Sequence, residues 1–304
     1  MNEYMQIIVP SEVTDARLVS STIAEPAAGE TLWNAATAYT VGQEAIRLTT
    51  HKKYKRLVAG TTATLPENDT VNWLDIGSTN RWSMFDDVVG TRSTTTSALT
   101  TVINTTGVGG LYLAELIGRT VLIQLKDSPG GSVVYTKTVD LDGTIVTSFY
   151  DWFYLPYEQL TEFTVLDMPY HYTAAQLITS ITGTGTVQCG VMKYGLNYII
   201  GKTQYGATSS IIDYSRKEQD AFGRYNIVER AFSKRASFDI FTEKADYNKI
   251  SKILQQIRAT PAVYVGTSYS GYEPLTVYGF YRDFSINVQY PTVHYCSLEV
   301  EGLI

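Results

Sequence analysis

Between residues 99 and 192 the chain repeats one pattern, in which short apolar segments alternate with turn-forming residues. The stretches 128–131 and 183–185 and the pair Asp142-Gly143 are examples of these turns. Short strands at such spacing, joined by Gly and Pro turns, predict an antiparallel sandwich, and eight strands suit a jelly roll. The eight expected strands cover residues 99–104, 111–117, 120–125, 133–139, 145–153, 163–166, 174–181 and 187–192.

Tyrosine is unusually frequent, with 23 residues in a chain of 304. Tyr and Thr suit half-buried positions on pleated sheets. Tyr also suits interfaces, where its ring packs and its hydroxyl stays hydrated. The composition therefore favours a mainly β chain and leaves open whether the rings face cores or partners.

Charge and hydropathy narrow the range of functions. The net charge of −6 argues against a dedicated nucleic-acid binder. No run of 18 apolar residues occurs, so we expect no membrane span. Residues 1–10 lack the pattern of a secretory signal. Cys189 and Cys296 lie far apart in apolar surroundings, so we expect buried free thiols rather than a disulfide.

A seam at residues 73–89, which holds Trp73 and Trp82, closes a small aromatic module and opens the strand-rich region. The N-terminal arm has strand character at residues 5–9, and we expect it to add a strand to a later domain or to a neighbouring subunit. The expected parts are an arm at 1–30, a small aromatic β module at 31–78, an antiparallel β-sandwich at 79–198 and an α+β domain at 199–304.

The C-terminal region contains the one clear helix signal. Ile250, Ile253, Leu254 and Ile257 recur at i, i+3, i+4 and i+7, which predicts an apolar stripe on a helix over 246–258. Strand-like segments surround this helix, so we expect one helix packed on an antiparallel sheet. These segments cover residues 209–214, 226–232, 236–241, 262–266, 276–281, 284–289 and 295–301.

Large aromatic residues must supply most of the core in a module of under 50 residues. They stand here in a specific order with two glycines: Trp33, Tyr39, Gly42, Tyr54, Trp73 and Gly77. In this order the module resembles the chitin-binding modules of carbohydrate-binding families V and XII. The resemblance implies a small β fold and sugar stacking by exposed aromatics after the second strand, where residues 57–61 hold none. Trp33 and Tyr54 are the candidate glycan-binding residues, and the alternative is that both rings lie in the core.

The middle region offers a weak metal signal. Its opening residues 80–86 and its strand count together resemble the galactose-binding-like sandwiches. Asp86, Asp87, Asp140 and Asp142 lack the remaining ligands of a calcium loop, and Asp142 precedes a glycine as in a hairpin turn. We expect no metal ion and no cofactor.

No catalytic constellation stands out. His51, His171 and His294 have no Cys, Asp or second His at metal-ligand spacing. Residues 266–271 do not match Gly-x-Ser-x-Gly, and no phosphate-binding loop occurs. We therefore expect a protein that is not an enzyme.

Several segments of the last region resemble tailed-phage and prophage tail proteins, which often carry a chitin-binding-like module near the N-terminus. The resemblance implies a structural component of the virion tail or baseplate, assembled in the host cytoplasm, with copies of itself and other tail proteins as partners. Whether it serves as ring, adaptor or fibre-attachment protein stays open. The alternative is an adhesin that binds a host surface glycan. The segments cover residues 204–206, 212–218, 228–232, 258–264 and 297–303.

Two charged stretches bear on partners. Lys52, Lys53, Lys55 and Arg56 form a basic cluster, which is either a solvated strand face or a contact for an acidic subunit or anionic glycan. The mixed charges of residues 216–235 suit ion pairs between subunits, which contribute specificity more than affinity.

Overall fold

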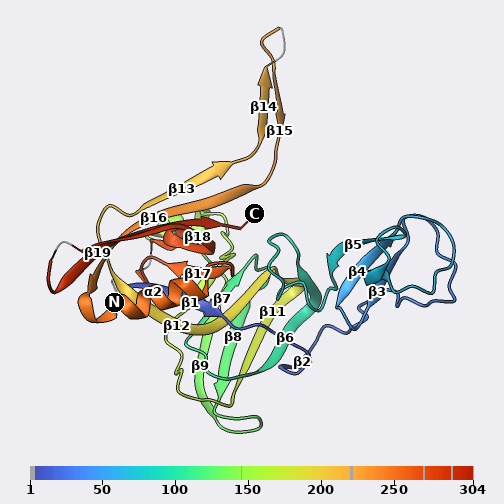
Figure 1. Ribbon diagram of the computed structural model, residues 1–304, viewed down its shortest axis with the longest axis horizontal. Helices are drawn as coiled ribbons and strands as arrows, with labels where there is room; N and C mark the ends of the chain where they lie inside the picture. Colours follow the sequence, from blue (N-terminus) through green and yellow to red (C-terminus); the bar gives the residue numbers. More distant parts are fainter. Residues whose placement is uncertain (1–3, 145, 220–221, 270, 289, 304) are drawn as a thin grey trace.

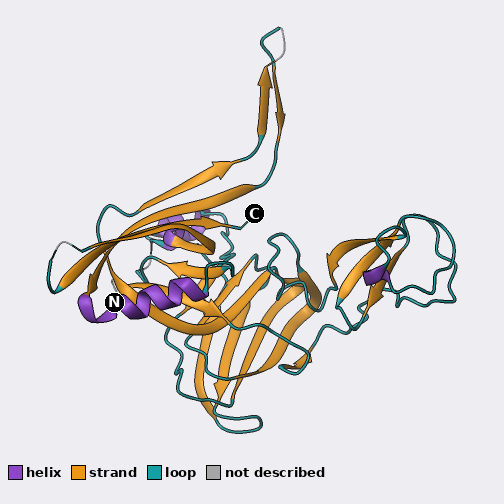
Figure 2. Ribbon diagram, in the orientation of Figure 1, coloured by secondary structure: helices purple, strands orange, loops and turns teal. Residues whose placement is uncertain are grey.

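The computed structural model describes residues 4–144, 146–219, 222–269, 271–288 and 290–303 (Figure 1). Strands dominate, and the larger of the two α-helices lies near the C-terminus (Figure 2). The prediction of a mainly β chain with antiparallel sheets and one substantial helix is therefore confirmed.

The largest sheet has nine strands in the order β10-β7-β12-β1-β17-β18-β19-β16-β13, and every pairing is antiparallel. Strand β12 also pairs with β16, at Lys202–Phe241 and Thr203–Ile240, so six strands of this sheet close on themselves. The bounds are β1 Tyr4–Pro10, β7 Gly110–Ala114, β10 Phe163–Val165, β12 Val191–Thr203, β13 Thr208–Asp213, β16 Phe232–Glu243, β17 Ala262–Val265, β18 Thr276–Asn287 and β19 Val293–Gly302.

Helix α2 (Tyr247–Gln256) packs against the closed part of this sheet. It follows the 3-10 turn η2 (Lys244–Asp246), and Ile250, Ile253 and Leu254 form its buried face. The helix lies within the range 246–258 that the apolar stripe predicts. Phe238, Leu298 and other alternating strand residues complete a core that burial of apolar surface stabilises.

The second sheet has five strands in the order β2-β6-β11-β8-β9. Its apolar face shares one core with β7, β10 and β12, so two sheets pack face to face as the sandwich prediction requires. Residues such as Ile103, Ile123 and Leu177 meet Leu113 and Tyr194 there. The bounds are β2 Leu18–Ser21, β6 Ser93–Thr105, β8 Thr120–Lys126, β9 Val133–Asp140 and β11 Ala175–Cys189.

Two expected segments of this region are wrong. Strand β11 runs on through 183–185, where we expected a turn, because the two glycines accommodate a shift in register between Thr182 and Thr186. The strand expected over 145–153 is instead helix α1 (Phe149–Tyr154), which Ser148 and Asp151 cap. Residue Ile145 lies outside the described residues.

The small module is a three-stranded sheet of β3 (Glu44–Arg47), β4 (Lys52–Arg56) and β5 (Trp73–Ser78), with the 3-10 turn η1 (Pro66–Asn68). It stands to one side of the two larger sheets (Figure 1).

The sheets connect the expected parts of the chain. Strand β1 of the N-terminal arm lies between β12 and β17, so the arm adds a strand to the large sheet of its own chain. The boundary expected between 198 and 199 falls inside β12. It does not separate two sheets, because β12 pairs with β7 and β1 on its two sides.

Besides the elements above, the chain forms a further 3-10 turn and a two-stranded ribbon. The 3-10 turn η3 (Glu273–Leu275) leads into β18. Strands β14 (Arg216–Gln219) and β15 (Tyr225–Val228) form a separate two-stranded ribbon. The strand expected over 226–232 is therefore wrong as one element, because β15 ends before β16 begins.

Candidate interaction surfaces

The rings of the small module mainly face inward. Tyr54 is 3% exposed and packs with Tyr39 and Trp73 in the module core. Trp33 is partly buried against the same cluster, and the guanidinium of Arg47 lies over its ring at 5.1 Å. Tyr54 therefore offers no ring face to a sugar, and Arg47 occupies part of the Trp33 surface. Tyr54 therefore fits the alternative in which the ring lies in the core. The aromatic residues that stand in this order in the sequence build the core of the module.

Most of the basic cluster has partners within the chain. Lys52 pairs with Asp75, and the Lys53 amine lies 3.8 Å from Glu30. Arg56 is buried, with its guanidinium over the Trp73 ring and its hydrogen bonds donated to the carbonyls of Val58 and Gly60. Three of the four cations thus hold the module together or to its surroundings.

A buried carboxylate joins the module to the sandwich. Glu25 accepts hydrogen bonds from Thr79 Oγ1 at 2.6 Å and from Trp82 Nε1 at 3.0 Å. His51 Nδ1 lies 3.0 Å from the same carboxylate, and the His51 ring stacks on Trp82 with centroids 4.1 Å apart. Because Trp82 belongs to the sandwich core, this cluster fixes the small module to the larger body.

The ribbon of β14 and β15 projects away from the body as a narrow arm (Figure 1). We call it the hairpin arm and define it as residues 214–219 and 222–231. Every residue of β14 and β15 is exposed. The exposed residues include Phe222, Tyr225 and Ile227, the last two 68% and 63% exposed. An isolated two-stranded ribbon is marginally stable in water, so this arm presents apolar surface that a partner would bury.

The register separates the two faces of the hairpin arm. Tyr225 lies opposite Gln219 and Ile227 lies opposite Lys217, so these side chains share one face. Val228 and Asn226 lie on the other face, opposite Arg216 and Glu218. The Tyr225 and Ile227 face is therefore the more apolar face.

A second exposed group lies between β9 and β10. We define the aromatic loop as residues 146–158, which include helix α1. None of the α1 residues is buried, and its rings are between 70% and 88% exposed. The exposed large side chains of the loop are Val146, Phe149, Tyr150, Trp152, Phe153, Tyr154, Leu155 and Tyr157. A group of exposed rings of this size is a candidate interaction site.

Local hydrogen bonds hold the aromatic loop in shape. Ser148 Oγ accepts from Asp151 N at 3.2 Å, and the Asp151 carboxylate accepts from Thr147 N at 3.0 Å and from its hydroxyl. This reciprocal capping starts helix α1 without tertiary support. The hydroxyls of Thr147 and Ser148 lower the pKa of Asp151 below its usual value. Two further hydrogen bonds join the segments before and after the helix: the Glu158 amide donates to Thr144 Oγ1, and the Tyr157 hydroxyl donates to Leu141 O.

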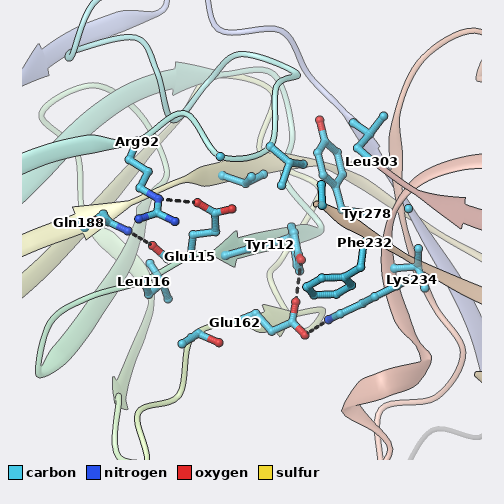
Figure 3. A pocket seen from close by; sticks show the side chains of 18 of the residues that line it. Arg92, Tyr112, Glu115, Leu116, Glu162, Gln188, Phe232, Lys234, Tyr278 and Leu303 are labelled. Atoms are coloured by element: carbon cyan, nitrogen blue, oxygen red, sulfur yellow. Dashed lines mark hydrogen bonds and ion pairs between the residues drawn. The ribbon is translucent and has the colours of Figure 1, made fainter. Parts of the chain in front are cut away.

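Beside this loop lies a pocket of about 640 Å³ (Figure 3). Its floor comes from Tyr112 and Ala114 of β7, Val191 of β12 and Tyr278 of β18. The charged groups at its walls are paired. Arg92 Nε lies 3.0 Å from Glu115, and Glu162 accepts from Lys234 and from the Tyr112 hydroxyl. Burial and the neighbouring Glu162 raise the pKa of Tyr112.

The pocket thus combines wall charges that are paired with one another and a lining that is otherwise mainly apolar. Phe232, at the base of the hairpin arm, lines its mouth. Thr161 and Glu162, just after the aromatic loop, line it as well. The arm, the pocket and the loop therefore adjoin one another.

The described part of the chain also contains two thiols and several possible metal ligands. Cys189 and Cys296 are free and buried, as expected, and burial raises the pKa of Cys189 to about 12. No group of three His, Cys, Asp or Glu residues among those described could hold a metal ion.

Known proteins give no direct guide to function, since no family model matches the chain and no curated protein matches it. Among the described residues, no helix is long and apolar enough to cross a membrane.

The sequence interpretation missed the aromatic loop because its apolar run looked like a strand. The capping pattern of Ser148 followed three residues later by Asp151 is the signal that could have identified a helix start there.

Proposed function

We propose that this protein is a non-enzymatic structural component of a bacteriophage tail or baseplate that assembles with copies of itself and with other tail proteins. The hairpin arm carries this proposal. It exposes Phe222, Tyr225 and Ile227 on a ribbon whose strand residues are all exposed, and burial of this surface on a neighbour would stabilise both partners.

The large sheet offers further surface for assembly. Strand β13 is its last strand, so one edge of β13 has no strand partner in the described chain. An unpaired edge is a template for pairing with another chain. The sequence segments that resemble phage tail proteins overlap the end of β13, at residues 212–213, and the two ends of the hairpin arm, at residues 214–218 and 228–231. The protein would act in the virion tail after assembly in the host cytoplasm.

Light scattering across a concentration series tests self-assembly. The variant Tyr225→Ser with Ile227→Ser removes the apolar face of the hairpin arm. The matched control, Glu218→Ser with Asn226→Ser, changes the opposite face of the same ribbon. We expect the first variant to raise the dissociation constant at least tenfold and the control to leave it unchanged. A wild-type chain that stays monomeric, together with normal tails on virions made without it, would overturn the proposal.

The alternative function, binding of a host surface glycan, has less support in the small module because Tyr54 is buried. Trp33 is the remaining candidate there. Retention on chitin that Trp33→Ala abolishes would support this alternative. Equal retention of wild type and variant would remove the module from consideration.

A further inference from the structure

The aromatic loop has the form of a knob rather than a plate. In an α-helix successive side chains are about 100° apart, so the five rings of Phe149–Tyr154 point around more than half of the helix circumference. Asp151 takes the remaining direction. A flat sugar-binding plate needs rings in one plane, whereas rings that radiate from a short helix suit insertion into a cavity.

The knob is organised before it meets a partner. Thr147, Ser148 and Asp151 close the first turn with their own side chains, and Tyr150 stacks on Tyr154 with centroids 4.7 Å apart. Ordering side chains on binding costs free energy, and preorganisation reduces that cost. These contacts lie within the loop and do not anchor it to the body.

The pocket beside the loop is complementary to such a knob. Its volume of about 640 Å³ lies within the range of cavities that enclose compact apolar groups. Arg92 and Lys234 at its walls are balanced by Glu115 and Glu162, so the rings of a loop would meet mainly its apolar lining. The loop's own rings are at least 70% exposed in α1, so they do not fill the pocket of their own chain.

We propose that the aromatic loop of one copy inserts into this pocket of a second copy. Loop and pocket adjoin in the chain, since Thr161 and Glu162 line the pocket a few residues after the loop ends. A two-fold axis near this junction would place each loop over the pocket of the other copy, as a self-complementary interface requires. The inference rests on the proposed self-assembly and assigns residues to one of its contacts.

Two variants with complementary defects test the contact. Trp152→Ser with Phe153→Ser, the loop variant, removes two rings and leaves the pocket intact. Thr161→Trp, the pocket variant, places a ring at an exposed part of the pocket lining that belongs to neither the hairpin arm nor the loop. Tyr170→Ser is the control, because Tyr170 is 69% exposed but lies outside the loop and the pocket.

The readout is sedimentation velocity on each variant and on a one-to-one mixture carrying different fluorophores. We expect the loop variant and the pocket variant each to raise the dissociation constant at least tenfold, and the control to match wild type. The mixture should associate more tightly than either variant alone, because the intact loop of one fits the intact pocket of the other. Circular dichroism melting, unchanged for these exposed positions, shows that the variants are folded.

The outcomes separate this inference from the proposed function. Wild-type protein that remains monomeric at every concentration overturns this inference, and it overturns the proposed function as well when virions made without the protein have normal tails. Wild-type assembly that the loop and pocket variants preserve overturns only the contact proposed here. Weakened assembly in both variants without recovery in the mixture also overturns it, since the loop would then contact another surface. Normal assembly of the loop variant with loss of binding to a glycan array would assign the loop to a sugar instead.

Discussion

The small module and the aromatic loop are both rich in large rings, and they use them in opposite ways. In the module, Tyr54 and Trp73 are no more than 3% exposed, and Arg56 lies over the Trp73 ring. In the loop, Trp152 is 70% exposed and helix α1 buries nothing. Of the rings first considered for binding, Tyr54 thus lies in a core and Trp33 packs against that core, whereas the rings first assigned to a strand form a surface.

The difference comes from what each segment has to stabilise. A three-stranded module has little apolar surface, so its aromatic residues must fill the interior. The loop needs no such core, because it connects strands of two sheets that already share one. Its helix is held by its own capping residues. Aromatic content alone therefore predicts neither a core nor a binding surface.

We expect the largest loss of stability from a substitution at the centre of the small module. Trp73→Ala removes a ring that is 2% exposed, and truncation of a buried Trp costs roughly 3–5 kcal/mol. The module should unfold locally while the two larger sheets remain folded. Limited proteolysis should cut within residues 31–78 of the variant. Equal protease resistance of variant and wild type would show that the module core does not depend on this ring.

A smaller effect is expected where the module meets the sandwich. Glu25→Ala leaves Trp82 Nε1 and Thr79 Oγ1 without their acceptor, and an unpaired buried polar group costs about 1–3 kcal/mol. Faster hydrogen exchange around residues 79–82 checks this expectation. Glu12→Ala is the control, because Glu12 is exposed. Unchanged exchange in the Glu25 variant would mean that other contacts hold the module in place.

The comparison also shows how far sequence reasoning reaches. Periodicity identified helix α2 because its buried face, Ile250, Ile253 and Leu254, repeats at helical spacing. Alternation identified strands such as β8, in which buried and partly buried residues alternate. These signals are local, because the spacing of apolar residues follows from the need of each helix or strand to bury one of its faces.

Sequence reasoning could not supply the connections between distant segments. Strand β1 lies between β12 and β17, and β12 returns to pair with β16, but no local pattern encodes these partners. The pocket depends on the same long-range pairings, since its floor joins β7, β12 and β18. For this reason the candidate residues chosen from sequence lay in one small module, whereas the surfaces found here come from several segments.

The smallest effect on folding should come from the loop. Trp152→Ala should change the free energy of unfolding by no more than about 0.5 kcal/mol, because the side chain is exposed and touches no core. Its loss should instead weaken association. Urea unfolding of this variant beside Trp73→Ala contrasts the two kinds of ring directly. A loss of several kcal/mol at Trp152 would show that the loop is part of the folded core.

The shape of the loop should depend on the charge of Asp151. Its pKa is lowered, first by the Thr147 hydroxyl and then by that of Ser148. The carboxylate therefore stabilises the helix turn at pH values above the ordinary aspartate value of 3.8, and this contribution is lost as the pH falls through the lower folded value. Near-ultraviolet circular dichroism of the loop rings should weaken in that acidic range. Asp151→Ala should show the weak signal already at neutral pH, with no further loss in acid. A signal that does not change in either case would mean that the rings are held by contacts other than this cap.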